Sequence, residues 1–144
     1  MKFPFFRIDE SEFSKQVAGH DTLPVWKTSR GIAVQTILVL LTVGVLTLAT
    51  LTYFNLVQGL SVADVVLSLV IYAPLLYFTF RGSALATVLL IAYYTLDKIA
   101  TPLVLGLAPN LISLVFWAIG TGPLWVAFQV ERAYEKSKKA PTAQ

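Results

Sequence analysis

The chain has 144 residues, of which 56% are hydrophobic and 13% are charged, and its net charge is +3. A soluble domain contains about 25% charged residues, so this composition excludes an ordinary soluble fold, which could not bury so much apolar surface. We therefore expect an all-α membrane protein with four transmembrane helices in one antiparallel bundle. The absence of cysteine excludes disulfides, thiolate metal ligands and cysteine nucleophiles.

Residues 1–30 form a mixed N-terminal segment before the first long apolar run. Acidic residues precede that run, so the segment does not have the form of a secretory signal peptide. Asp9 and Glu12 have the spacing of a capping box, which predicts a short amphipathic helix over about 10–18. This helix would lie on lipid headgroups or dock a partner protein. His20, the only histidine, is expected to be solvated, as a histidine in a loop usually is.

The first span is expected at about 31–55. At 100° per residue, its polar side chains fall within one arc of about 140°. Lipid cannot hydrogen-bond hydroxyl or amide groups, so we expect this arc to face protein, as the wall of a polar pathway or as a helix-packing surface. The polar arc contains Gln35, Thr36, Thr42, Thr47, Thr50 and Tyr53, and the apolar arc contains Val34, Ile37, Leu41, Val45, Leu48 and Leu51.

The second and third spans, at about 62–80 and 84–102, are expected to form a hairpin around the short turn at Gly82. Asp64 lies 18 residues before this glycine and Lys98 lies 16 residues after it. The difference of two residues is about 3 Å of helix rise, so the two side chains should reach similar depth. We therefore predict an ion pair between them that fixes the register of the hairpin.

Asp97 adds a second acid to this polar cluster. It neighbours Lys98 in the sequence, so the two side chains should point about 100° apart and Asp97 should need another partner. Tyr93, Tyr94 or the polar arc of the first span could supply one. Two roles remain open for Asp97: a hydrogen-bonded structural residue, or a titrating site in a proton- or cation-coupled carrier. The depth of Asp97, away from the bilayer centre, favours the structural role.

Helix breaks are expected within two of the spans, because proline lacks the N–H group that a helix needs. The candidates are Pro74 in the second span, and Gly120, Gly122 and Pro123 in the fourth span, at about 110–130. Transporters use broken helices to present free backbone groups to ions or substrates. The alternative, which we favour, is close helix packing at glycine together with a proline kink. Residues 131–144 form a basic tail that continues the helix into water.

The distribution of basic residues predicts the topology. Five Lys and Arg residues precede the first span, one lies in the turn between the second and third spans, and four follow the fourth span. The other two connections contain none. Under the positive-inside rule, this pattern places both termini in the cytoplasm. It also explains the positive net charge without a nucleic-acid partner.

The sequence contains no zinc motif, Gly-rich phosphate loop or nucleophile elbow. We therefore predict no catalytic residues, no metal site and no cofactor. The leading hypothesis is a non-enzymatic membrane subunit that associates with itself or with a larger complex. Its expected partners are the lipid bilayer and either another protein or further copies of the chain. The alternative is a small oligomeric proton- or cation-coupled transporter or channel that uses Asp97.

Three short motifs carry a loose resemblance that covers the second to fourth spans. They are Phe80-Arg-Gly-Ser83, Leu96-Asp-Lys98 and Val130-Glu-Arg-Ala-Tyr134, and they resemble small uncharacterised bacterial four-helix inner-membrane proteins. The resemblance implies a bacterial inner membrane and no particular activity. In length and number of spans the chain is also similar to the small multidrug resistance transporters. It departs from their pattern, because they carry a glutamate in the first helix and the first span here contains no acid.

Overall fold

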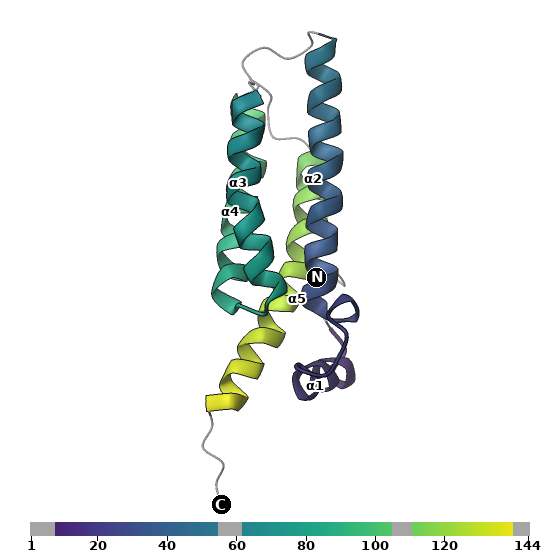
Figure 1. Ribbon diagram of the computed structural model, residues 1–144. Coiled ribbons are helices and arrows are strands. Elements are labelled where there is room, and N and C mark those ends of the chain that lie inside the picture. Colours follow the sequence, from purple (N-terminus) through teal and green to yellow (C-terminus); the bar gives the residue numbers. More distant parts are fainter. Residues whose placement is uncertain (1–7, 55–61, 105–110, 140–144) are drawn as a thin grey trace, which may run out of the picture.

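The computed structural model describes residues 8–54, 62–104 and 111–139 (Figure 1). This part of the chain contains five α-helices and one short 3-10 helix. Four of the α-helices are long and apolar enough to cross a membrane, which confirms the predicted all-α fold with four candidate spans. The elements are α1 (Glu10–Ala18), η2 (Val25–Lys27), α2 (Ser29–Tyr53), α3 (Val62–Phe80), α4 (Ala84–Val104) and α5 (Leu111–Lys139).

The four long helices form an elongated bundle with two distinct ends (Figure 1). At one end lie α1, the start of α2, the α3–α4 turn and the C-terminal part of α5. We call this the turn end. The opposite end holds the end of α2 and the start of α3. Both ends of the described chain therefore lie at the turn end, as an even number of spans requires.

The turn between α3 and α4 follows a helix-termination motif that depends on glycine. Gly82 has φ 85°, a left-handed conformation that glycine adopts without steric cost. Its N–H donates to the Thr79 carbonyl (3.0 Å), and the Ser83 N–H donates to the Phe78 carbonyl (3.0 Å), as in a Schellman motif. The Ser83 hydroxyl oxygen then accepts from the Ala86 N–H at 3.3 Å and caps α4. The predicted hairpin is confirmed.

The apolar core lies in the half of the bundle nearest the turn end, where the four long helices pack closely. Its buried members are Ala33, Val34, Ile37, Tyr72, Leu76, Leu90, Tyr94, Leu124 and Ala127. Among the described residues in the half of the bundle away from the turn, partly buried side chains such as Leu41 pack against the edge of this core, and none is a buried member of it. The bundle is therefore tight at the turn end and more open toward the opposite end.

Most of the polar arc of the first span does not face the other helices of its own chain, so the expectation that it packs within this bundle is wrong. In α2, Val34 and Ile37 are buried in the bundle, whereas Gln35, Thr42 and Thr50 are exposed. The physical reason is that threonine can satisfy its hydroxyl within its own helix. Four threonine hydroxyls donate to the carbonyl four residues earlier, at 2.8–2.9 Å: those of Thr36, Thr42, Thr47 and Thr50. The apolar side of α2 is thus left to fill the core.

The candidate helix breaks lie within continuous helices. Pro74 is inside α3, and α5 runs through Gly120, Gly122 and Pro123 without interruption. A Cβ atom added at Gly120 would lie 2.5 Å from the Tyr94 ring, so glycine at this position lets α4 approach α5 closely. This arrangement agrees with the close-packing alternative rather than with an unwound segment.

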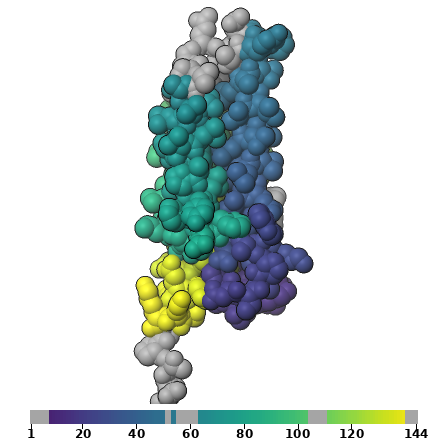
Figure 2. All heavy atoms as spheres, viewed as in Figure 1, coloured from purple at the N-terminus to yellow at the C-terminus, as the bar shows by residue number. Residues whose placement is uncertain are grey.

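The predicted short helix near the N-terminus is confirmed as α1, with Asp9 as its N-cap. α1 packs against the C-terminal part of α5, and Figure 2 shows the two side by side below the α3–α4 turn. Gln16 is buried, and its Oε1 accepts from both the N–H (2.9 Å) and the hydroxyl (2.6 Å) of Ser29. The N-terminal segment is therefore tied to the start of α2.

Candidate functional site

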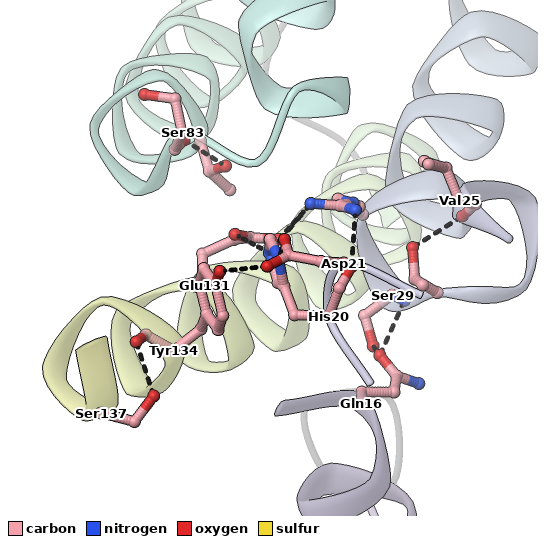
Figure 3. Close-up of polar contacts among 12 residues, drawn as sticks. Gln16, His20, Asp21, Val25, Ser29, Ser83, Glu131, Tyr134 and Ser137 are labelled. Atoms are coloured by element: carbon pink, nitrogen blue, oxygen red, sulfur yellow. Dashed lines mark hydrogen bonds and ion pairs between the residues drawn. The ribbon is translucent and has the colours of Figure 1, made fainter. Parts of the chain in front are cut away.

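A group of buried charges joins three distant segments at the turn end (Figure 3). His20 Nε2 lies 2.7 Å from Glu131 Oε2, and Arg30 Nη1 lies 3.6 Å from Glu131 Oε1. Arg30 Nη2 also donates to the His20 carbonyl at 3.1 Å. The three residues are only 8%, 8% and 2% exposed, in the order His20, Arg30, Glu131. They come from the loop after α1, the start of α2 and α5, and we call them the turn-end triad.

Two more residues extend the triad toward solvent. Tyr134 donates to Asp21 Oδ2 at 2.6 Å, and His20 Nδ1 lies 3.1 Å from Asp21 Oδ1. The Tyr134 ring stacks on the His20 ring, with centroids 3.7 Å apart. The hydrogen bonds from Tyr134 and His20 favour the charged carboxylate and lower the pKa of Asp21, while the bond to Asp21 raises the pKa of Tyr134.

His20 Nε2 lies between the Glu131 carboxylate and the Arg30 guanidinium, because Arg30 Nη1 is also only 2.9 Å from this nitrogen. A protonated Nε2 donates to Glu131, whereas an unprotonated Nε2 accepts from Arg30. In both protonation states the ring keeps a polar partner in the buried site. The triad is thus suited to holding the three segments together.

Gly82 closes the triad from the α3–α4 turn. A Cβ atom added there would lie 2.5 Å from Arg30 Nη1, 2.9 Å from Glu131 Oε2 and 3.3 Å from His20 Cε1. The glycine backbone therefore packs directly on the charged groups. All four spans are connected at this end, either through the triad or through the turn that covers it.

Two expectations from the sequence are wrong here. His20 is buried and paired rather than solvated, and Glu131 is buried in the triad rather than part of a tail in water. The reason is that the N-terminal segment folds back over α5 and removes both side chains from solvent. A signal was present in the sequence: Arg30 borders the first span and Glu131 borders the fourth, at the same end as the Gly82 turn.

The second polar site is a cavity of about 340 Å³ in the more open half of the bundle, lined by residues of all four spans. We call it the bundle cavity. Much of its wall is apolar. The polar side chains in the lining are Thr47, Asp64, Ser68, Tyr72, Tyr94, Asp97, Lys98, Thr101 and Ser113. The structure thus brings together Asp64, Asp97, Lys98 and Tyr94 of the predicted cluster.

Within this cavity, Asp97 and Lys98 form an ion pair with Nζ–Oδ2 at 3.2 Å. Thr101 donates to the other carboxylate oxygen of Asp97 at 3.4 Å. The expectation that Asp97 needs a partner other than Lys98 is therefore wrong, because the long lysine side chain bends back to its neighbour. Asp64 lines the same cavity, and its ion pair with Lys98 stays a prediction.

Two tyrosines of the cavity lining, Tyr72 and Tyr94, lie close to this ion pair. Lys98 Nζ lies 5.2 Å from the centroid of the Tyr94 ring, within cation–π range. Tyr72 is 1% exposed, and its buried hydroxyl lies near the Asp97 carboxylate. Tyr93 supports the Tyr72 ring edge-on, with centroids 4.8 Å apart.

The two sites differ in what they can do chemically. The turn-end triad is sealed and stabilises the fold, whereas the side chains of Asp97 and Lys98 are 23% and 28% exposed and can meet a ligand. Comparison with protein-family models, curated proteins and solved structures gives no match for this chain.

Proposed function

We propose that the protein is a non-enzymatic membrane subunit that associates with further copies of itself through α2. The observation that carries this proposal is the outward-facing polar surface of that helix. The positive-inside pattern of the sequence supports an orientation with both termini cytoplasmic, and an inner (plasma) membrane location is part of the proposal. The position of α1 and the end of α5 at one end of the bundle agrees with this topology.

The exposed face of α2 has the spacing of a helix-packing seam. Its residues follow one another at alternating intervals of four and three positions, the repeat that keeps one face of a helix against a partner helix. We call it the α2 stripe, and all its members are exposed: Gln35, Val39, Thr42, Leu46, Ala49 and Tyr53. The stripe alternates residues that are small or polar with large apolar residues along most of its length.

A second copy of α2 suits this stripe better than lipid does. Two copies with the same topology are parallel, so each residue of the stripe meets its own counterpart across a two-fold axis. The Gln35 amide is self-complementary, because it carries both donors and an acceptor, and lipid would satisfy neither. Thr42 and Ala49 are small enough to let two helix backbones approach. The stripe carries no charge that would repel its counterpart.

Replacing Gln35 by leucine should weaken self-association about 3- to 30-fold, the range that corresponds to about 0.6–2 kcal/mol for a hydrogen bond between membrane helices. Sedimentation equilibrium in an uncharged detergent measures this change. Gln35→Asn keeps the amide and should retain most of the affinity. Leu85→Ala, at an exposed position of α4, should leave it unchanged. A wild-type chain that stays monomeric at every protein-to-detergent ratio would refute the proposal.

The bundle cavity favours a second candidate function, a small proton- or cation-coupled transporter that uses Asp97. A carboxylate in a cavity reached by all four spans can bind and release a cation. In proteoliposomes, a cation or proton gradient should be dissipated by the wild-type chain and not by Asp97→Asn, while Glu135→Gln in the exposed part of α5 should retain the flux. Equal flux through wild type and Asp97→Asn would argue against this function.

A further inference from the structure

We propose that a groove between α1 and α5 at the turn end is a binding site for one anionic phospholipid. The groove has a volume of about 390 Å³, and its walls are Phe13 of α1 and one face of α5 from Trp125 to Lys136. We call it the interfacial groove. The inference goes beyond the proposed self-association through α2, and it needs only that α5 spans the membrane, as its length and composition allow.

The α5 wall of the groove is aromatic at one end and basic at the other. Trp125, Phe128, Arg132 and Lys136 all line the groove. They follow one another at intervals of three or four residues, which brings them to the same side of a helix. From Trp125 to Lys136 the helix rises about 16 Å. This order suits a phospholipid, whose acyl chains would meet the aromatic end while its phosphate meets the basic end.

The position of the groove along α5 matches the boundary between hydrocarbon and headgroups. The candidate span begins at Leu111, and about 20 residues cross the hydrocarbon core, so the core ends at about position 130. Trp125 is 42% exposed and lies just before this boundary, where tryptophan is typical of membrane helices. Arg132 and Lys136 lie just beyond it. The basic end of the groove is therefore level with lipid phosphates.

The charge of the groove selects an anionic headgroup. The described residues that line it include two cations, Arg132 and Lys136, and no carboxylate. The neighbouring acid Glu131 is already bound within the turn-end triad. Glu135 lies outside the lining, and none of the ion pairs in the described part of the chain includes Glu135, Arg132 or Lys136. A phosphate would supply the counter-charge, whereas the ammonium of a zwitterionic headgroup would find no carboxylate.

Arg132 is placed to bind a phosphate. Its guanidinium carbon lies 6.0 Å from the centroid of the Phe128 ring, within cation–π range. The Trp125 ring lies beside that of Phe128, with centroids 5.6 Å apart. The guanidinium group can form two parallel hydrogen bonds with a phosphate, and Lys136, one turn further along α5, adds a second charge.

α1 supplies the second wall, which distinguishes the groove from a merely basic helix. Phe13 is half-buried and lines the groove. Its neighbour Glu12 accepts from Gln16 at 3.0 Å and pairs with Lys15 at 3.7 Å, so this acid has partners on its own helix. The turn-end triad joins the N-terminal segment to α5, and the groove is complete only when this segment is in place.

Two lipids with the same acyl chains test the choice of headgroup: phosphatidylglycerol, which is anionic, and phosphatidylcholine, which is zwitterionic. Native mass spectrometry of the full chain, in uncharged detergent with equal amounts of both, counts the lipids that stay bound. The proposal predicts retention of one phosphatidylglycerol in preference to phosphatidylcholine. Equal retention of the two would overturn it. Inorganic phosphate at equal concentration should not displace the lipid, because it makes no contact with the aromatic end. Displacement by phosphate would overturn the assignment to a lipid.

Substitutions separate the groove from general basic charge. Arg132→Gln with Lys136→Gln should weaken phosphatidylglycerol binding about tenfold or more, given the usual attraction of basic residues to anionic lipid. Lys138→Gln with Lys139→Gln removes the same charge from exposed positions of α5 outside the lining and should have little effect. Phe13→Ala, which leaves the charge unchanged, should weaken binding severalfold.

The melting temperature of each variant checks that it is folded, and the groove cations are exposed, so their replacement should leave it unchanged. Equal weakening by the two double substitutions would show that diffuse charge holds the lipid and would overturn the proposal. Self-association through α2 is measured without anionic lipid, so either proposal can fail while the other stands.

Discussion

Replacing Glu131 by alanine is expected to lower the free energy of unfolding by about 3–5 kcal/mol, the usual effect of removing one partner from a buried ion pair. Glu131 is only 2% exposed and is the sole acid whose carboxylate faces both Arg30 and His20 in the described part of the chain. Without it, the Arg30 guanidinium is left buried beside the histidine. The N-terminal segment should detach from α5, because its main link to that helix is lost.

Denaturant unfolding in detergent, followed by tryptophan fluorescence, measures this loss. Glu135→Ala is the matched control, because Glu135 lies one turn further along α5 and is exposed. It should change the free energy of unfolding by less than about 0.5 kcal/mol. The double substitution Arg30→Ala with Glu131→Ala should cost clearly less than the sum of the single substitutions, because the two side chains interact. Equal effects of Glu131→Ala and Glu135→Ala would contradict the triad.

Replacing Gly82 by alanine should lower the free energy of unfolding by about 2–4 kcal/mol. A left-handed conformation costs a residue with a side chain about 1–2 kcal/mol, and overpacking adds about 1–3 kcal/mol. Both apply here, because φ is 85° and the new Cβ atom would meet Arg30 Nη1 at 2.5 Å. The turn would have to move away from the triad, which would also disturb Glu131.

Gly44→Ala provides the control for this substitution. A Cβ atom at Gly44, within α2, would have no neighbour within 4 Å. Alanine there should leave stability unchanged or raise it by up to about 1 kcal/mol through its better helix propensity. The two glycine substitutions should therefore change the unfolding midpoint in different ways. Equal destabilisation by both would show that neither the conformation of Gly82 nor its contacts matter.

The helices, the hairpin turn and the cap of α1 could be predicted because they depend on local patterns. Apolar runs of sufficient length indicate spans, and Asp9 marks the start of α1 through its side-chain oxygen. The expected first span at 31–55 and its observed counterpart at Ser29–Tyr53 differ by two residues at each end. The helical tail after residue 130 was also expected, and α5 continues to Lys139.

The orientation of α2 could not be predicted by counting polar residues. That argument treated every hydroxyl as needing a partner from another helix. The threonine hydroxyls instead bond to carbonyls of their own helix, as at Thr42, so their side chains can face outward. The argument that neighbouring residues on a helix point too far apart to pair also failed for Asp97 and Lys98. Positions 100° apart still meet when one side chain is as long and flexible as lysine.

The turn-end triad was missed because its members are far apart in the sequence. His20 and Glu131 are separated by 111 positions, and no local pattern connects them. Comparing depths in the membrane, as was done for Asp64 and Lys98, would also have placed Arg30 and Glu131 side by side. Arg30 precedes the first span directly and Glu131 follows the fourth, so both lie at one level. What the sequence could not indicate is that the loop after α1 folds back to bury them.

Disulfide crosslinking along α2 tests self-association through the α2 stripe most directly, and the absence of cysteine from the chain makes single-cysteine variants unambiguous. Cysteine is placed at Thr42 or Ala49 of the stripe, and at Leu41 or Leu48, which are half-buried neighbours on the side facing the bundle. A disulfide requires Cα atoms about 4.4–6.8 Å apart. Oxidation in membranes should therefore yield covalent dimers for the two stripe positions and not for their neighbours. Dimers at all four positions alike, or at none, would contradict the proposed interface.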